Sequence, residues 1–300
     1  MRKVTHPVEG FLAALAAVAV LSIMDAVMKH LVIAIGIFAV SIWRAVANLA
    51  LSATLYLPRR SRRWPTGRVL WMHVSRSVVV TIMAVLFFWG IGRVPLAQAI
   101  ALTFIAPLIA MLLAPLFLKE KLAPRSIAGA LAAFAGVIVI VVGQARAEVA
   151  DDVLLGIAAI LGSAVCYSGN ILMMRWQALA AKPLEISFFQ ALVIFLIWIA
   201  ALPVVGVPQW PQGQFLWIVI ASVLSTSGSL LFAWAYARGE ASYLAVTEYS
   251  AFIWASICGW LAFAERVSLS TFMGALLIVG GCLLAARRQR PPLPEIDVAA

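Results

Sequence analysis

Long apolar runs of the sequence enclose four ionisable residues: Asp25, Arg44, Arg76 and Glu248. A charged side chain in such surroundings costs several kcal/mol unless another group pairs with it or water reaches it. Each of the four therefore marks a candidate functional position. Their depths within the runs predict two ion pairs, Asp25 with Arg44 and Arg76 with Glu248.

Each of the two predicted ion pairs can have one of three roles. It can tie helices together, act as a gate, or recognise the two charges of a zwitterion. The structural role is the better interpretation of Asp25–Arg44, and the alternatives weigh equally for Arg76–Glu248. An enclosed carboxylate can also take up and release a proton, so Glu248 or Asp25 is a candidate for carrying a coupling proton.

Uncharged polar and aromatic side chains gather in the same runs. The candidate substrate-binding residues are Ser77, Thr81, Gln98, Thr103, Tyr167, Asn170, Trp234 and Tyr243, together with Glu248. A single hydroxyl in an apolar helix more often bonds a neighbouring helix than a ligand, so their concentration in a few runs is the informative feature. The aromatic rings suit an amphipathic or aromatic substrate through stacking and cation–π contacts.

Signatures of enzymes and metal sites are missing from the sequence. The three histidines are His6, His30 and His73, and the three cysteines are Cys166, Cys258 and Cys282. Neither set has metal-ligand spacing, and no HExxH, GxSxG or P-loop motif occurs. We therefore predict no enzyme activity, no metal and no cofactor.

The composition indicates which elements must position these residues. Hydrophobic residues make up 64% of the chain and charged residues 11%, which is more apolar surface than a soluble protein can bury. A helix needs roughly 20 apolar residues to span a bilayer. Ten predicted spans cover residues 10–29, 37–57, 69–91, 96–118, 125–142, 154–177, 183–204, 215–237, 241–263 and 271–286.

The basic residues predict how the spans are oriented. The net charge of +10 is compatible with nucleic-acid binding, but the basic residues lie in short connections between apolar runs. Most of the 22 Lys and Arg fall on the side that carries both termini. By the positive-inside rule we expect both termini in the cytoplasm and no nucleic-acid partner.

The two halves of the chain resemble each other. At a shift of 145 residues, Trp89 aligns with Trp234, Glu120 with Glu265, Gly129 with Gly274 and Gly136 with Gly281; at a shift of 146, Lys29 aligns with the like-charged Arg175. We therefore predict two five-helix repeats, residues 1–145 and 146–300, within one membrane domain. Because five is odd, the second repeat must be inverted, an arrangement that allows alternating access to a central site.

Two further features have structural interpretations. The glycines of each repeat are seven residues apart and share a helix face, which favours close packing of the fifth and tenth spans, with a homodimer face as the alternative. Glu120 and Glu265 are interpreted as charges at helix ends. Pro107 and Pro115 are expected to bend or break the fourth span.

Two stretches carry a family resemblance: PLAQAIALTFIAPLIAMLLAPLFLKEKLAPRSIAGALAAFAGVIV and ASYLAVTEYSAFIWASICGWLAFAERVSLSTFMGALLIVGG. Each joins a small-residue span, an acidic–basic pair and a glycine-containing span. On these stretches the chain resembles the ten-helix EamA-type branch of the drug/metabolite transporter superfamily. It departs from the internal pattern where Pro107 is replaced by Phe252.

The resemblance implies a polytopic all-α secondary transporter of a bacterial inner membrane, with a small-molecule substrate and the lipid bilayer as partners. Within this superfamily, the chain most resembles bacterial exporters of amino acids, particularly aromatic ones. The alternatives are a transporter of another metabolite or drug, and a lipid flippase or scaffold without a soluble substrate. A monomer and a homodimer are both compatible with the sequence.

Overall fold

The computed structural model describes residues 7–59, 64–106, 108–109, 124–145, 151–236 and 247–286, and these residues contain helices and no strand. The helices are α1 Pro7–Ile35, α2 Ile37–Tyr56, α3 Arg68–Ile91, α4 Leu96–Thr103, α6 Pro124–Ala145, α7 Asp151–Ala180, α8 Pro183–Val205, α9 Phe215–Tyr236, α11 Ala251–Phe263 and α12 Leu269–Ala286. A short 3₁₀ helix, η1, covers Leu57–Arg59. The all-helical class is as predicted.

Six of the described helices, α1, α2, α3, α7, α8 and α9, are long and apolar enough to cross a membrane, and α6, α11 and α12 contain shorter apolar stretches. In lipid a helix satisfies its backbone hydrogen bonds internally, which is why apolar runs of this length become helices. The end of α1 differs from the prediction, because the helix continues past Lys29 to Ile35. The chain turns at Gly36, where φ is 80°, a conformation that glycine adopts without strain.

The fourth predicted span is not one continuous α-helix in the described residues. The helix α4 ends at Thr103, and a turn follows at Phe104 and Ile105. Pro107 lies just beyond, and a proline lacks the amide hydrogen and disfavours helix in the residue before it. The predicted break is confirmed there, whereas Pro115 lies outside the described residues.

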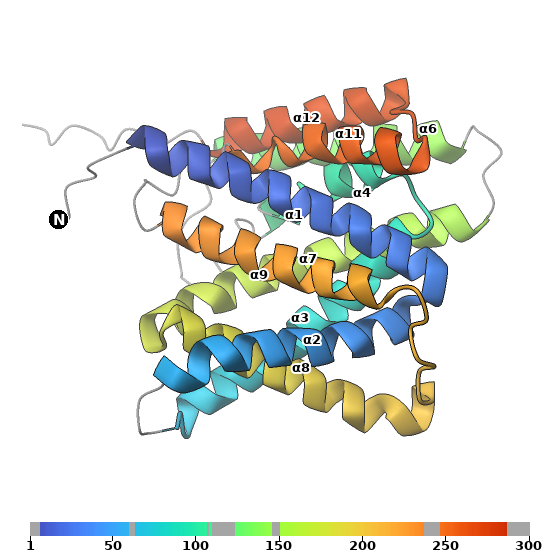
Figure 1. Ribbon diagram of the computed structural model, residues 1–300. Helices are drawn as coiled ribbons and strands as arrows, with labels where there is room; N and C mark the ends of the chain where they lie inside the picture. The colour runs from blue at the N-terminus through green and yellow to red at the C-terminus, as the bar shows by residue number, and fades with distance from the viewer. Residues whose placement is uncertain are drawn as a thin grey trace, which may run out of the picture.

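Helices from the two halves of the chain pack against each other in pairs. The closest pairs are α6 with α12, α1 with α9, α3 with α7, and α2 with α8. Figure 1 shows α6 and α12 at one edge of the bundle and α2 with α8 at the opposite edge. Each pair joins a helix that precedes residue 146 to one that follows it, so the halves form one interlocked bundle.

The α6–α12 crossing depends on glycine. A Cβ atom on Gly136 would lie 2.6 Å from the carbonyl oxygen of Gly274, and one on Gly274 would lie 2.7 Å from that of Gly136. A Cβ on Gly281 would likewise meet the carbonyl of Gly129. Small residues let helix backbones approach closely in membranes. The predicted packing role of these glycines is confirmed.

Among the described residues, the connections α1–α2, α3–α4, α8–α9 and α11–α12 meet at one end of the bundle, which we call the far end. The opposite end, where α3 and α8 begin, is the near end. On α1, His30 lies 3.1 Å from the side-chain oxygen of Gln214, which precedes α9. On α2, the indole of Trp43 donates to the carbonyl of Gln209 at 3.0 Å. These contacts hold the α1–α2 connection against the α8–α9 connection.

Candidate functional site

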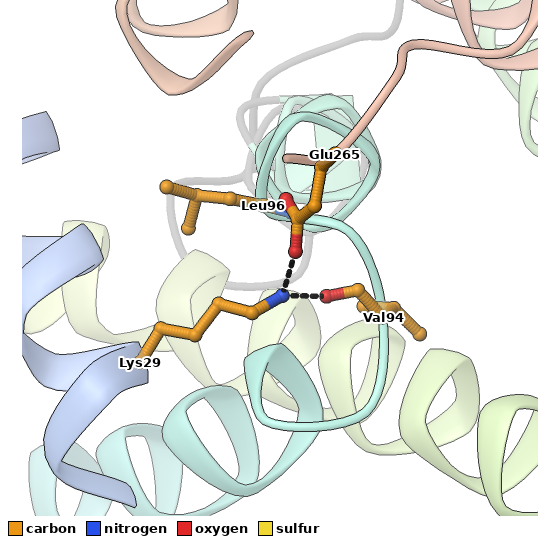
Figure 2. A network of polar contacts seen from close by, with 4 residues as sticks. All are labelled: Lys29, Val94, Leu96 and Glu265. Carbon is orange, nitrogen blue, oxygen red and sulfur yellow. Dashed lines mark hydrogen bonds and ion pairs between the residues drawn. The ribbon is translucent and has the colours of Figure 1, made fainter. Parts of the chain in front are cut away.

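A buried ion pair at the far end joins three segments of the chain (Figure 2). Lys29 of α1 pairs with Glu265, in the α11–α12 connection, and donates a second hydrogen bond to the carbonyl of Val94 at 2.6 Å. The other carboxylate oxygen of Glu265 accepts the backbone N–H of Leu96 at 2.7 Å. We call Lys29, Val94, Leu96 and Glu265 the far-end clamp.

The far-end clamp satisfies groups that would otherwise be costly to bury. Leu96 is the first residue of α4, and the first amides of a helix have no partner within it. A carboxylate there also interacts favourably with the positive end of the helix dipole. Lys29 is only 4% exposed, so its ammonium depends on Glu265 and on the Val94 carbonyl.

The structure corrects two predictions at this point. Lys29 was placed at the end of a span, but it lies within α1 because the helix continues to Ile35. Glu265 does follow the end of α11, but its interpretation as only a helix-end charge missed its partners, because its carboxylate is bonded to both Lys29 and Leu96. A signal was present in the sequence, since both residues align with a like charge in the other half. Glu120, the counterpart of Glu265, lies outside the described residues.

Asp25 and Arg44 form a second charged group, inside the bundle. Asp25 on α1 and Arg44 on α2 lie near enough to interact electrostatically. The predicted ion pair is not formed, since no direct contact joins the two side chains in the described part of the chain. The Arg44 guanidinium lies 5.1 Å from the centre of the Phe88 ring, and its Nη2 is 3.3 Å from the hydroxyl of Ser225. Its Nε is buried and has no hydrogen-bond partner among the residues that the structure describes. The guanidinium therefore keeps one donor that no described protein group uses.

Arg76 is the centre of a polar network near the near end. Its Nε donates to Asn170 Oδ1 at 2.8 Å and its Nη1 to Gln177 Oε1 at 2.5 Å. The Gln177 amide nitrogen lies 2.7 Å from His73 Nδ1, and His73 Nε2 lies 3.5 Å from Glu185 on α8. The network joins α3, α7 and α8.

The predicted pairing of Arg76 with Glu248 is not what the structure shows. The partners of Arg76 come from α7, because α3 packs along α7, and no ion pair joins it to Glu248 in the described ranges. Depth in a span does not indicate which neighbouring helix a side chain faces. The sequence analysis missed His73, Gln177 and Glu185, although the spacing of seven residues between Asn170 and Gln177 places both on one helix face.

Replacing Gln177 with Leu tests the Arg76 network. The substitution removes one acceptor from a buried guanidinium, and we expect the free energy of unfolding to fall by about 1.5 kcal/mol. Denaturant unfolding in detergent measures the change. The matched control is Gln190→Leu on α8, a half-buried glutamine for which we expect a change within about 0.5 kcal/mol. Equal losses in the two variants would contradict the role assigned to Gln177.

The remaining predicted residues are dispersed. Ser77, Thr81 and Thr103 donate to carbonyls of their own helices. Tyr167 on α7 interacts electrostatically with Glu248, which precedes α11. Trp234 is exposed near the end of α9, and Tyr243 lies outside the described residues. Gln98 is buried and lines a cavity at the far end.

Comparison with known proteins identifies the family. The sequence pattern of the EamA-like transporter family matches residues 8–142 and again residues 154–287. The chain belongs to the EamA-like transporter family. It is therefore a multi-pass membrane transporter of small molecules and not an enzyme.

Curated relatives of this EamA-like transporter are bacterial. The chain is 26% identical over 288 residues to a riboflavin transporter of Vibrio cholerae, covering 91% of each protein. It is 25% identical to a riboflavin transporter of Brucella anthropi, over 83% of this chain and 87% of that protein. It is also 27% identical to a pseudopaline exporter of Pseudomonas aeruginosa, over 73% of this chain and 76% of that protein.

A solved crystal structure shares the fold. It aligns with a TM-score of 0.61 over 94% of this chain and 96% of that chain, at 21% sequence identity. At this identity the likeness concerns the fold of the EamA-like transporter alone.

Proposed function

We propose that this transporter exports small amphipathic metabolites from a bacterial cytoplasm by alternating access to a site inside the helix bundle. Aromatic amino acids are the first candidates from the sequence. Riboflavin is the second, because two relatives with that printed substrate match more than four-fifths of the chain. The observation that carries the proposal is the charged group of Asp25 and Arg44 within a bundle of apolar helices.

Ten spans in two inverted five-helix repeats belong to this proposal. The family pattern matches once in each half of the chain, which supports a duplication. In the two proposed repeats α1 corresponds to α7, and α3 corresponds to α9. The α1–α9 pair therefore has the α3–α7 pair as its counterpart, and both pairs are present. Likewise, the contact of Gly136 with Gly274 has the contact of Gly281 with Gly129 as its counterpart, and this second contact is also present. Both termini are proposed to be cytoplasmic because of the bias of Lys and Arg.

The Asp25–Arg44 group is suited to a solute that carries charge and an aromatic ring. The free donor of Arg44 can bind an anionic group, and Asp25 can bind a cationic one. Phe88 lies against Arg44 and offers an apolar ring for stacking. Because Asp25 and Arg44 are not directly bonded, a solute between them need not break an existing ion pair.

The far-end clamp is proposed to hold the far end closed in the state that the structure represents. It connects α1, the start of α4 and the end of α11, three segments that must separate if a solute is to leave between them. Opening would expose the charges to water, which offsets the loss of the ion pair. Such a contact can break and re-form during the transport cycle.

The experiment that tests the function is flux in proteoliposomes with labelled phenylalanine, tryptophan, leucine and riboflavin. We expect flux of at least one aromatic compound, and Arg44→Gln should lower kcat/KM about tenfold or more, since a hydrogen bond to a charged group is lost. The control is Arg68→Gln, an exposed residue at the start of α3. No flux of any of the four compounds would contradict the proposed function.

Glu248 is the proposed carrier of a coupling proton, close to Tyr167. If it carries the proton, Glu248→Gln should abolish the response of flux to an imposed pH gradient while substrate exchange at equal pH continues. Counterflow with and without the gradient separates the two activities. An unchanged response to the gradient would return Glu248 to a structural role.

A further inference from the structure

A second cavity at the far end contains a single charged residue. It has a volume of about 420 Å³ and lies between the α1–α2 connection, the end of α3 and the end of α8. Arg93, just beyond the end of α3, lines it, and we call it the Arg93 cavity. Its other lining residues are apolar, aromatic, glycine or proline, so no lining side chain offers a carboxylate or a carbonyl group.

The protein uses only part of the Arg93 guanidinium. Its Nη1 donates to the carbonyl of Trp89 at 3.1 Å, and the group lies 3.5 Å from the centre of the Trp89 ring. Among the described residues, Nε is buried without a partner, whereas Nη2 is not buried and also has no partner. No carboxylate in the described ranges forms an ion pair with Arg93, the exposed Asp152 of the neighbouring α7 included. The cavity therefore presents a permanent cation with an accessible donor.

The first turn of α2 adds to the positive character of the cavity. Ile37, Phe38 and Ala39 line it, and the first amides of a helix have no partner within that helix. Gly36, the residue before α2, has no side chain with which to cap these amides. A helix start alone does not select a ligand. Together with the guanidinium of Arg93, the positive end of the α2 dipole favours a bound anionic group.

The length of the helices places the Arg93 cavity at the level of the lipid headgroups. α3 has 24 residues and α8 has 23, which gives lengths of about 36 and 35 Å at 1.5 Å per residue. The hydrocarbon core of a bilayer is about 30 Å thick, so the ends of both helices reach its polar boundary. Apolar side chains beside the cavity are strongly exposed, Phe38 by 48% and Val204 by 89%. Such a rim suits acyl chains.

The charge of the Arg93 cavity distinguishes it from the Asp25–Arg44 group. An amino acid carries an ammonium group, for which Asp25 offers a counter-charge inside the bundle. No lining residue of the Arg93 cavity does so, and an ammonium group buried there would lose its hydration without compensation. The cavity therefore favours a molecule with a negative charge, no cationic group and an apolar body.

We propose that the Arg93 cavity binds an anionic phospholipid, with the phosphate against Arg93 and the start of α2 and the acyl chains along the apolar rim. Phosphatidylglycerol has the required chemistry, since it carries one negative charge and no cation. Hydrogen bonds between a guanidinium and a phosphate are charge-assisted and therefore strong. The volume of the cavity lies within the range of about 300–1,000 Å³ that is usual for ligand pockets. The site is separate from the solute site and does not depend on which solute is transported.

Native mass spectrometry of the full chain tests the site. The protein is delipidated in detergent and titrated with phosphatidylglycerol or phosphatidylcholine of identical acyl chains. We expect the first phosphatidylglycerol to bind about tenfold more tightly than phosphatidylcholine, since no group of the cavity compensates the choline cation. This comparison uses the unaltered protein and does not depend on whether a variant folds. Equal affinities for the two lipids would overturn the proposal.

Two variants locate the lipid in the Arg93 cavity. Arg93→Gln should weaken phosphatidylglycerol binding about tenfold and leave phosphatidylcholine binding unchanged. Ala39→Trp keeps the charge but fills part of the cavity, and it should also weaken phosphatidylglycerol binding. Arg68→Gln is the matched control, since Arg68 is exposed at the opposite end of α3, and it should keep the preference of the wild type.

Two outcomes would contradict this location and this occupant. A preference for phosphatidylglycerol in Arg93→Gln equal to that of the wild type would overturn the assignment to the Arg93 cavity. N-acetylphenylalanine is a soluble anion with an apolar ring and no cationic group. If it displaces phosphatidylglycerol at equal concentration, the occupant is a solute and the lipid is overturned. Neither outcome affects the flux experiment that tests the proposed function.

Discussion

Glu265→Gln is expected to lower the free energy of unfolding by about 3–5 kcal/mol, because it leaves the buried ammonium of Lys29 without its counter-charge. Because glutamine has nearly the same size as glutamate, the loss of stability measures the removal of the charge and not the creation of a cavity. Denaturant unfolding of the purified protein in detergent measures it. The neighbouring Arg266→Gln alters an exposed charge and should stay within about 0.5 kcal/mol.

The double variant Lys29→Met/Glu265→Met separates an unpaired charge from general damage. Replacing both partners by apolar residues removes the buried charges together, and we expect most of the lost stability to return. A double variant as unstable as Glu265→Gln would show that the far-end clamp is not held by its ion pair.

The same single variant tests the clamp as a gate. In a background without native cysteines, Ser256→Cys places a thiol in the cavity beside Glu265. Adding Glu265→Gln should then raise the rate of labelling by a membrane-impermeant maleimide, since the closed far end has lost its ion pair. An unchanged rate would contradict the gating role even if stability falls.

Gly136→Leu is expected to have the second large effect, a loss of about 3 kcal/mol in the free energy of unfolding. Even a single Cβ at this position would lie 2.6 Å from the backbone carbonyl oxygen of Gly274, and a backbone atom cannot turn aside as a side chain can. The α6 and α12 helices must move apart to admit the side chain, and their interface loses contacts. Thermal unfolding in detergent measures the effect.

The same substitution on the open side of α12 is the control. A Cβ on Gly280 meets no atom within 4 Å, so Gly280→Leu should be neutral or slightly stabilising. If the two variants lose equal stability, the cost arises from the helix backbone or from leucine itself, and the proposed close approach of α6 and α12 is wrong.

The positions of the helices could be predicted closely from the sequence. The predicted span 69–91 corresponds to α3 Arg68–Ile91, and 183–204 to α8 Pro183–Val205. Hydrophobicity and helix-breaking residues are local signals, and a helix in lipid closes its hydrogen bonds within itself. The error at the end of α1 arose because a buried Lys29 resembles a loop charge until its partner is known.

The partners of the polar residues could be predicted less well. The Asp25–Arg44 group was anticipated from depth along adjacent helices, since α1 and α2 are joined directly at Gly36. Arg76 was assigned to Glu248 by depth alone and contacts Asn170 and Gln177 instead. Depth gives the position of a side chain along the membrane normal, but it does not say which neighbouring helix the side chain faces.

The sequence by itself determined the helical class and most helix boundaries, and its repeat and motifs indicated the family. These properties depend on residues close together in the chain. The far-end clamp was decided only by the tertiary structure, because Lys29 and Glu265 are 236 residues apart. Their meeting depends on how α1, α4 and α11 pack, and the rotation of each helix against its neighbours is set by the whole interface.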